Sequence, residues 1–120
     1  MGDELKQGEL WWIDDSEPRG SEPGYRRPWL VVQNDRANAT AIRTVLMCPL
    51  TTNLRLARAP GNVRLGDGEA GLLRESVVVV SGLSARDRQQ LDQRIGQLSR
   101  DRLAQVLSGI VLLLDPSEAL

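Results

Sequence analysis

The chain has 120 residues, a formal net charge of −1 at pH 7, one cysteine and no histidine. The missing histidine excludes Ser-His-Asp catalysis, Cys-His catalysis and two-histidine cleavage of RNA, and it removes the commonest zinc ligand. The single cysteine, Cys48, excludes an intrachain disulfide, and we expect it to be an inert, buried side chain in a reducing compartment.

The length of the chain favours a single domain over residues 1–120. No basic segment followed by an apolar segment opens the sequence, and no apolar run approaches the roughly 20 residues that span a bilayer. We therefore expect a soluble, cytoplasmic protein.

Two predicted strands flank a loop rich in glycine, proline and charge. Glu9–Asp14 has the apolar content of a strand, and its neighbouring tryptophans, Trp11 and Trp12, should point to opposite faces, so that at least one lies in the core. The loop, residues 15–27, leads into a second strand, Pro28–Gln33, rich in β-branched and aromatic residues. Arginines in such a loop are held next to a rigid strand, where functional sites are commonly built.

Three further strands are predicted, at Thr44–Leu50, Asn62–Leu65 and Ser76–Ser81, separated by turns rich in glycine and polar residues. The last contains four consecutive valines, residues 77–80, a pattern typical of a strand buried on both faces. Either a closed barrel or a dimer partner would supply that burial.

The C-terminal third is predicted to be helical. Ser84–Leu98 combines a capping-box spacing at its start with an apolar stripe at Leu91, Ile95 and Leu98. Ser99 begins a second helix that ends before Pro116. We expect its apolar stripe to pack in the core: Leu103, Val106, Leu107, Ile110, Val111 and Leu114. The fold class is therefore α+β, mainly β with C-terminal helices.

The charges are distributed unevenly along the near-neutral chain. Between Arg19 and Arg64 there are eight arginines, and the only acidic residues are Glu22 and Asp35. Arginine is the side chain best suited to bidentate contact with phosphate, which favours a nucleic-acid partner. A solvated arginine-rich surface is the alternative.

Four motifs occur together in the order and spacing of a known family. They are GELWWIDD from Gly8, GSEPG from Gly20, RRP followed by LVVQND from Arg26, and PLTTNLR from Pro49. From Gly8 to about Leu114 the chain resembles the MazF/PemK toxin endoribonucleases of bacterial type II toxin–antitoxin pairs. The resemblance implies a small Src-homology-3-like β-barrel of the PemK/CcdB type that forms a homodimer with C₂ symmetry.

The resemblance also implies an activity. Such toxins are mRNA interferases that cleave single-stranded RNA at short sequences without a metal or other cofactor, which stops translation and growth. The ribose 2′-hydroxyl attacks the adjacent phosphate and leaves a 2′,3′-cyclic phosphate and a 5′-hydroxyl. Arg27 of the RRP motif and Thr51 of PLTT match the family's catalytic arginine and threonine. Both side chains suit a reaction that gathers negative charge on phosphate oxygens.

Arginine is a poor general base because its pKa lies above roughly 12. Glu22, the carboxylate nearest to Arg27 in sequence, is a candidate general base. An ion pair between Glu22 and Arg26 or Arg19 is the alternative role for this side chain. Hydrogen-bonding side chains near the motifs are candidates for RNA binding. They are Arg19, Ser21, Arg26, Asn34, Thr52, Asn53 and Ser76.

The same surface is expected to bind the disordered C-terminal segment of a cognate antitoxin. One alternative function is a non-catalytic CcdB-like toxin or binding module that acts by protein contact alone. The helix end at Leu112–Leu114 lacks the aromatic anchor typical of a binding hot spot, so the RRP and PLTT motifs favour the nuclease. A degenerate homologue that only binds RNA or antitoxin is a third interpretation.

Overall fold

The structure is a computed structural model that describes residues 5–15, 25–115 and 117. It contains seven strands, two α-helices and four short 3₁₀-helices within these residues. In chain order they are β1 (Glu9–Asp15), β2 (Tyr25–Val31), α1 (Asp35–Asn38), β3 (Thr44–Thr51), η1 (Leu54–Arg58), β4 (Val63–Leu65), η2 (Glu69–Gly71), β5 (Ser76–Val78), η3 (Val80–Gly82), β6 (Ser84–Asp87), η4 (Arg88–Gln90), β7 (Leu91–Gln97) and α2 (Arg100–Leu113).

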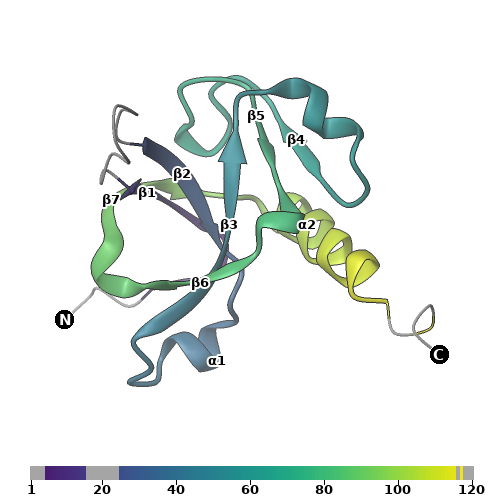
Figure 1. Cartoon of the computed structure of the whole chain (residues 1–120). Helices are drawn as coiled ribbons and strands as arrows, with labels where there is room; N and C mark the ends of the chain where they lie inside the picture. Colours follow the sequence, from purple (N-terminus) through teal and green to yellow (C-terminus); the bar gives the residue numbers. More distant parts are fainter. Residues whose placement is uncertain (1–4, 16–24, 116, 118–120) are drawn as a thin grey trace, which may run out of the picture.

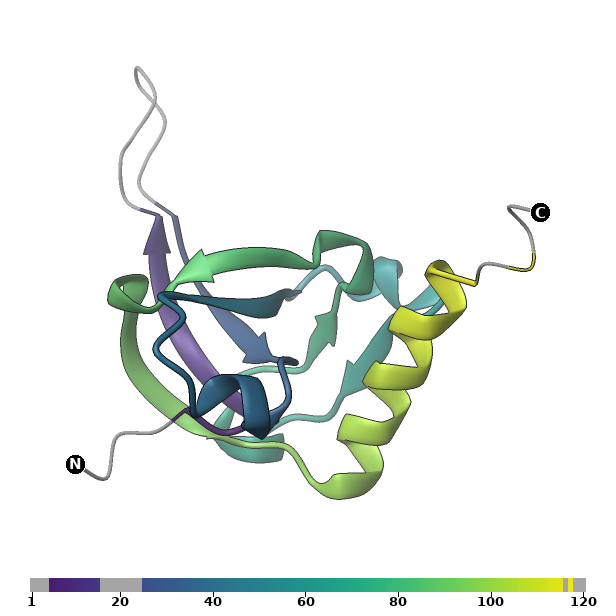
Figure 2. The same ribbon diagram turned by 90° about the horizontal axis from the view of Figure 1, so that it is seen from below.

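The strands form one strongly curved antiparallel sheet in the order β4-β5-β3-β2-β1-β7, and β6 pairs with the first half of β3 (Figure 1). The helix α2 lies against one side of the sheet, beside β4 (Figure 2). This half-barrel with a C-terminal helix confirms the predicted fold class. The C-terminal α-helix is single, however, where two were predicted.

The core has two parts, which lie on opposite faces of the central strands. Leu10, Leu30 and Cys48 belong to the larger cluster, which α2 completes through Val106. Trp29 and its neighbours on the other face belong to a smaller cluster. Because successive side chains of a strand point to opposite faces, one register across β1, β2 and β3 fills both clusters.

The two adjacent tryptophans of β1 separate as predicted. Trp11 packs against the smaller cluster. Trp12 is half-buried on the opposite face of the strand. Three of the four valines, Val77, Val78 and Val80, are buried as predicted, whereas Val79 is partly exposed, and this chain alone encloses the buried three. The strand is shorter than predicted, because β5 ends at Val78 and a 3₁₀ turn follows.

The helix predicted at Ser84–Leu98 is wrong. This segment forms two strands, β6 and β7, joined by the 3₁₀-helix η4. A capping box is present, but it joins Asp87 to Gln90 and stabilises only the single turn of η4. The strand β6 pairs with β3 and β7 pairs with β1, so the ladder hydrogen bonds of both segments go to distant strands.

The final helix begins as predicted, with the Ser99 side chain accepting a hydrogen bond from the Arg102 amide. Its predicted apolar stripe is only partly in the core. Val106 is fully buried, whereas Val111 and Leu114 are each 66% exposed. The packed part of the helix therefore ends about one turn before the helix itself does. No helix in the described residues is long and apolar enough to cross a membrane.

The contact that seats α2 on the sheet passes between two glycines. A Cβ atom built on Gly109 would lie 2.0 Å from the carbonyl oxygen of Gly61, in the turn before β4. Gly61 has φ +84°, a conformation that favours glycine. The backbones of the helix and the turn therefore touch directly, and no side chain fits between them.

Gly109→Ala should destabilise the protein. In an unrestricted helix this change stabilises by roughly 0.5–1 kcal/mol, but here the added methyl must push the helix from the sheet, at a cost of about 1–3 kcal/mol. Urea denaturation would measure the loss, and Ser108→Ala, at an exposed neighbouring position, is the matched control. An increase in stability for Gly109→Ala would contradict this close contact.

Cys48 should react slowly with thiol reagents in the native protein. It is fully buried, and desolvation raises the pKa of its thiol to about 12. At pH 8 only roughly one molecule in ten thousand would then carry the thiolate. We expect labelling to be negligible in the folded state and complete in denaturant, measured by mass spectrometry. Fast labelling of the folded protein would show that the thiol is accessible.

Candidate active site

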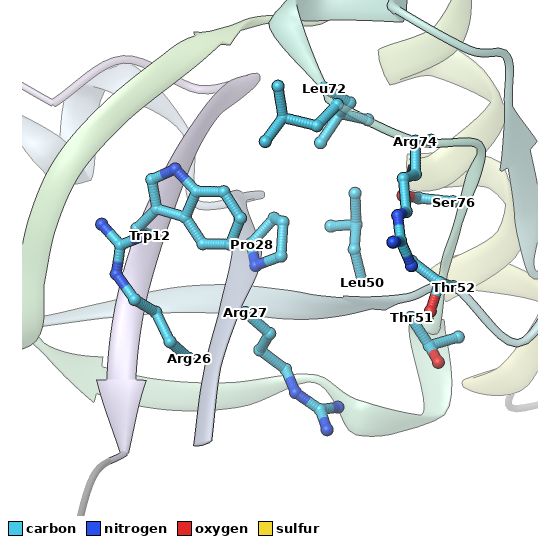
Figure 3. A pocket seen from close by; sticks show the side chains of 11 residues that line it. Trp12, Arg26, Arg27, Pro28, Leu50, Thr51, Thr52, Leu72, Arg74 and Ser76 are labelled. Carbon is cyan, nitrogen blue, oxygen red and sulfur yellow. Dashed lines mark hydrogen bonds between the residues drawn. The ribbon is translucent and has the colours of Figure 1, made fainter. Parts of the chain in front are cut away.

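A pocket of about 280 Å³ opens where the central strands leave the core (Figure 3). It lies between the ends of β1, β2 and β3 and the connection from η2 to β5. Its lining residues are Trp12, Arg26, Arg27, Pro28, Leu50, Thr51, Thr52, Leu72, Leu73, Arg74 and Ser76. The pocket therefore combines apolar side chains, three arginines and three hydroxyls.

The apolar floor of the pocket continues the main core. Trp12 pairs with Pro28 across β1 and β2, on the same face as the buried pair Leu10 and Leu30. Continuing the register of β2 and β3 outward sets Pro28 opposite Leu50. Trp12, Pro28 and Leu50 are the outermost residues on the core face of these strands. They therefore contact the core on one side and line the pocket on the other.

The polar rim contains the two residues predicted to be catalytic. Arg27 lies on β2 opposite Ile13 of β1. The same register, extended two residues beyond the Trp29–Pro49 pair, sets Arg27 opposite Thr51. Both side chains line the pocket, and Figure 3 shows them extending from neighbouring strands. Strand pairing thus brings together two motifs that are distant in sequence.

The hydroxyl of Thr51 is oriented to donate a proton. Its oxygen accepts a hydrogen bond of 3.1 Å from the backbone amide of Asn53. No described residue accepts the hydroxyl hydrogen. A hydroxyl whose oxygen is already an acceptor can still donate its hydrogen to another group, and Thr51 lines the pocket. Thr51 is therefore suited to donate to an anionic oxygen bound there.

Arg26 is held in place by two contacts. Its guanidinium carbon lies 4.5 Å from the centroid of the Trp12 ring, and its Nη2 donates to the Asp92 carboxylate of β7 at 3.1 Å. Its side chain stays 42% exposed. These contacts orient the indole as one wall of the pocket, and they partly neutralise the Arg26 charge.

The structure brings only some of the predicted RNA-binding residues into the pocket. Arg26, Thr52 and Ser76 line it. Asn53 instead caps η1 and Asn34 caps α1, each through its side-chain oxygen. Asn34 follows the far end of β2, away from Arg27, so it does not join this site. Arg19, Ser21 and Glu22 lie outside the described residues.

Two polar or aromatic pocket residues, Trp12 and Arg74, are not among the site residues that the sequence predicts. The sequence places Trp12 on a strand with Trp11, with at least one of the two in the core, and assigns no role to Arg74. Arg74 lies two residues before Ser76, which begins a predicted strand, and this closeness to a candidate binding residue is the signal that points to it. Leu72 and Leu73 carried no comparable signal.

The arrangement suits a ligand that is flat and apolar at one end and anionic at the other. Trp12 and Pro28 offer surfaces on which a base can stack. Arg27, Arg74 and the Thr51 hydroxyl offer donors for phosphate oxygens. Within the described part of the chain, no three His, Cys, Asp or Glu side chains group closely enough to hold a metal ion.

Comparisons with known proteins identify the family. The profile described as "PemK-like, MazF-like toxin of type II toxin-antitoxin system" matches residues 6–114. Endoribonuclease MazF6 of Mycobacterium tuberculosis is 36% identical over 111 residues, which cover 92% of this chain and 97% of that protein. Endoribonuclease MazF9 of the same species is 34% identical over 115 residues, with the same coverage of both chains.

Solved structures agree with this result. The crystal structure of MazE-MazF (Form-II) from Deinococcus radiodurans superposes with a TM-score of 0.76 at 25% identity, covering 93% of this chain and 96% of that one. An endoribonuclease in complex with its cognate antitoxin from a mycobacterial species has the same fold, with a TM-score of 0.73 at 20% identity and coverage of 92% and 95%. From the match over nearly its whole length, the chain belongs to the family of PemK-like, MazF-like toxins of type II toxin–antitoxin systems.

Proposed function

We propose that this protein is the toxin of a toxin–antitoxin pair and an endoribonuclease that cuts single-stranded mRNA in the pocket between β2, β3 and β5. The observation that carries the proposal is the shared location of Arg27 and Thr51, which line one pocket whose floor is apolar. Relatives 34–36% identical to the chain are named endoribonucleases, which supports the same reaction class.

In the proposed reaction the ribose 2′-oxygen forms a bond to the adjacent phosphorus while the bond from phosphorus to the 5′-oxygen breaks. The products are a 2′,3′-cyclic phosphate and a 5′-hydroxyl, so the 2′-oxygen loses a proton and the 5′-oxygen gains one. Negative charge accumulates on the phosphorus-bound oxygens in the transition state. A fixed arginine and a hydroxyl donor stabilise that charge more than they stabilise the ground state.

Arg27 is proposed as the charge-stabilising residue and Thr51 as the hydrogen-bond donor. Glu22 remains our candidate for the base that removes the 2′-proton. Arg26, Thr52 and Ser76 are proposed to contact the RNA from the pocket wall, with Arg19, Ser21, Asn34 and Asn53 as candidates for contacts beyond it. The mechanism uses no metal ion or other cofactor.

We further propose that the protein acts in the cytoplasm as a homodimer that a cognate antitoxin inhibits. The exposed apolar residues at the end of α2, Val111 to Leu114, supply a surface that a second copy would cover. Among the solved relatives, MazE-MazF complexes support an antitoxin partner. An acidic disordered segment would suit the arginine-lined pocket.

The proposal is tested by incubating the purified protein with a long single-stranded RNA in EDTA and mapping the fragment ends. We expect cuts at defined sequences that leave 2′,3′-cyclic phosphates, and their loss in Arg27→Ala. Arg100→Ala, which removes an exposed arginine outside the pocket, is the matched control and should cut like the wild type. Cleavage only after addition of divalent metal would contradict the mechanism. No cleavage by the folded protein would favour a toxin that acts by protein contact alone.

Thr51→Ala should lower the single-turnover cleavage rate about 10²–10³-fold, the usual effect of removing one transition-state donor. Thr51→Ser keeps the hydroxyl and should retain most of the rate. Thr44→Ala, at the exposed start of the same strand, controls for general effects on β3. An unchanged rate for Thr51→Ala would remove this hydroxyl from the mechanism.

A further inference from the structure

Arg74 lies on the wall of the pocket opposite Trp12. It belongs to the connection between η2 and β5, and it lines the same pocket as Arg27 and Thr51. Figure 3 shows its side chain beside Thr52 and Ser76, across the pocket from the indole. The pocket thus has a guanidinium on each side.

The backbone at Arg74 is fixed by the start of β5. The hydroxyl of Ser76 donates a hydrogen bond of 3.0 Å to the Arg74 carbonyl oxygen. Ser76 itself is buried and pairs with Leu65 of β4. The hydroxyl proton of Ser76 is therefore used in this contact, which helps to position Arg74, and only the Ser76 oxygen is left to accept a hydrogen bond from RNA.

The nearest carboxylate in sequence is held by another residue. Both oxygens of Glu75 accept hydrogen bonds of 3.2 Å from Nη2 of Arg64 on β4. Asp67 lines an adjoining depression with Arg74 but forms no ion pair with it. Among the described residues, the Arg74 guanidinium has neither a hydrogen bond nor an ion pair. This distinguishes it from Arg26, which Asp92 partly neutralises.

We propose that Arg74 is a second phosphate-binding arginine of the pocket and holds a phosphate of the RNA strand next to the one cleaved at Arg27; this inference rests on the proposed function. A guanidinium without a protein partner, placed by a fixed backbone at the rim of an apolar pocket, is available for bidentate contact with phosphate. Phosphate contacts position a nucleic acid and carry no base information. Arg74 therefore contributes affinity and placement, not the choice of sequence.

The test measures binding of a single-stranded RNA that carries the mapped cleavage sequence with 2′-deoxyribose at the attacked nucleotide, so that it binds without being cut. Fluorescence anisotropy over a series of salt concentrations gives the Kd and its salt dependence. The proteins compared are the wild type, Arg74→Ala, Arg74→Lys and the control Arg100→Ala. Circular dichroism checks that each variant is folded.

We expect Arg74→Ala to weaken binding about 5- to 50-fold at low salt and to reduce the slope of log K against log salt by about 0.7, the value for one phosphate of a single strand. Arg74→Lys should recover part of the affinity, because it restores the charge but not the planar fork. Arg100→Ala should stay within about twofold of the wild type. At saturating cleavable RNA, Arg74→Ala should cut at nearly the wild-type rate, unlike Arg27→Ala.

Three results would overturn the inference. The first is binding by Arg74→Ala that matches Arg100→Ala. The second is a saturated cleavage rate that falls in Arg74→Ala as far as in Arg27→Ala, since that would indicate a transition-state role. The third is weaker RNA binding by Arg74→Ala with an unchanged slope of log K against log salt, since the loss of one phosphate contact must reduce that slope. If the wild type neither binds nor cuts RNA, it is the proposed function that fails.

Discussion

The register shared by β1, β2 and β3 is the constraint on which both the core and the pocket depend. It aligns Leu10 and Leu30 in the core and, one row further out, Trp12 and Pro28 at the pocket floor. A slip of one residue would exchange the two faces of a strand, so Arg27 would leave the rim and the side chains of the two core clusters would change places. The free energy of core burial therefore also fixes the geometry of the site, which suits a reaction that needs preorganised charge.

The second organising feature is the choice of arginines that form ion pairs with the acids of β1. Two of the three acids of β1 pair with arginines of the last two strands, Glu9 with Arg94 at 2.7 Å and Asp15 with Arg86. They are therefore not used to neutralise the arginine-rich middle of the chain. The sequence indicates a local positive excess there, and two of its arginines, Arg26 and Arg64, are partly neutralised by Asp92 and Glu75, which reduces that excess. The pair between Asp15 and Arg86 also places Arg86 over the Trp29 ring, so the same contact stabilises the smaller core cluster.

The sequence predicted strands correctly where the apolar residues were β-branched or aromatic. It failed where the spacing of apolar residues is compatible with both a helix and a strand. Glu9–Asp14 and Thr44–Leu50 each match the observed strand to within one residue. Leu91 and Ile95 are four residues apart, which places them on one face of a helix and equally on one face of a strand. Only pairing with β1 decides between the two, and that contact is long-range. The motif residues Arg27 and Thr51 were identified from their resemblance, whereas Trp12 and Arg74 needed the assembled sheet.

The composition of the pocket also bears on how its reaction would proceed. None of the described lining residues is an acid, and three are arginines. Such a site stabilises negative charge at every stage, and it favours ionisation of a hydroxyl bound next to the guanidinium groups. A strong base is then less important than fixed positive charge, because the field of the arginines already lowers the free energy of the alkoxide. Under the proposed function, Arg27 and Thr51 would act on the phosphate oxygens, and a weak base such as the Glu22 carboxylate would suffice.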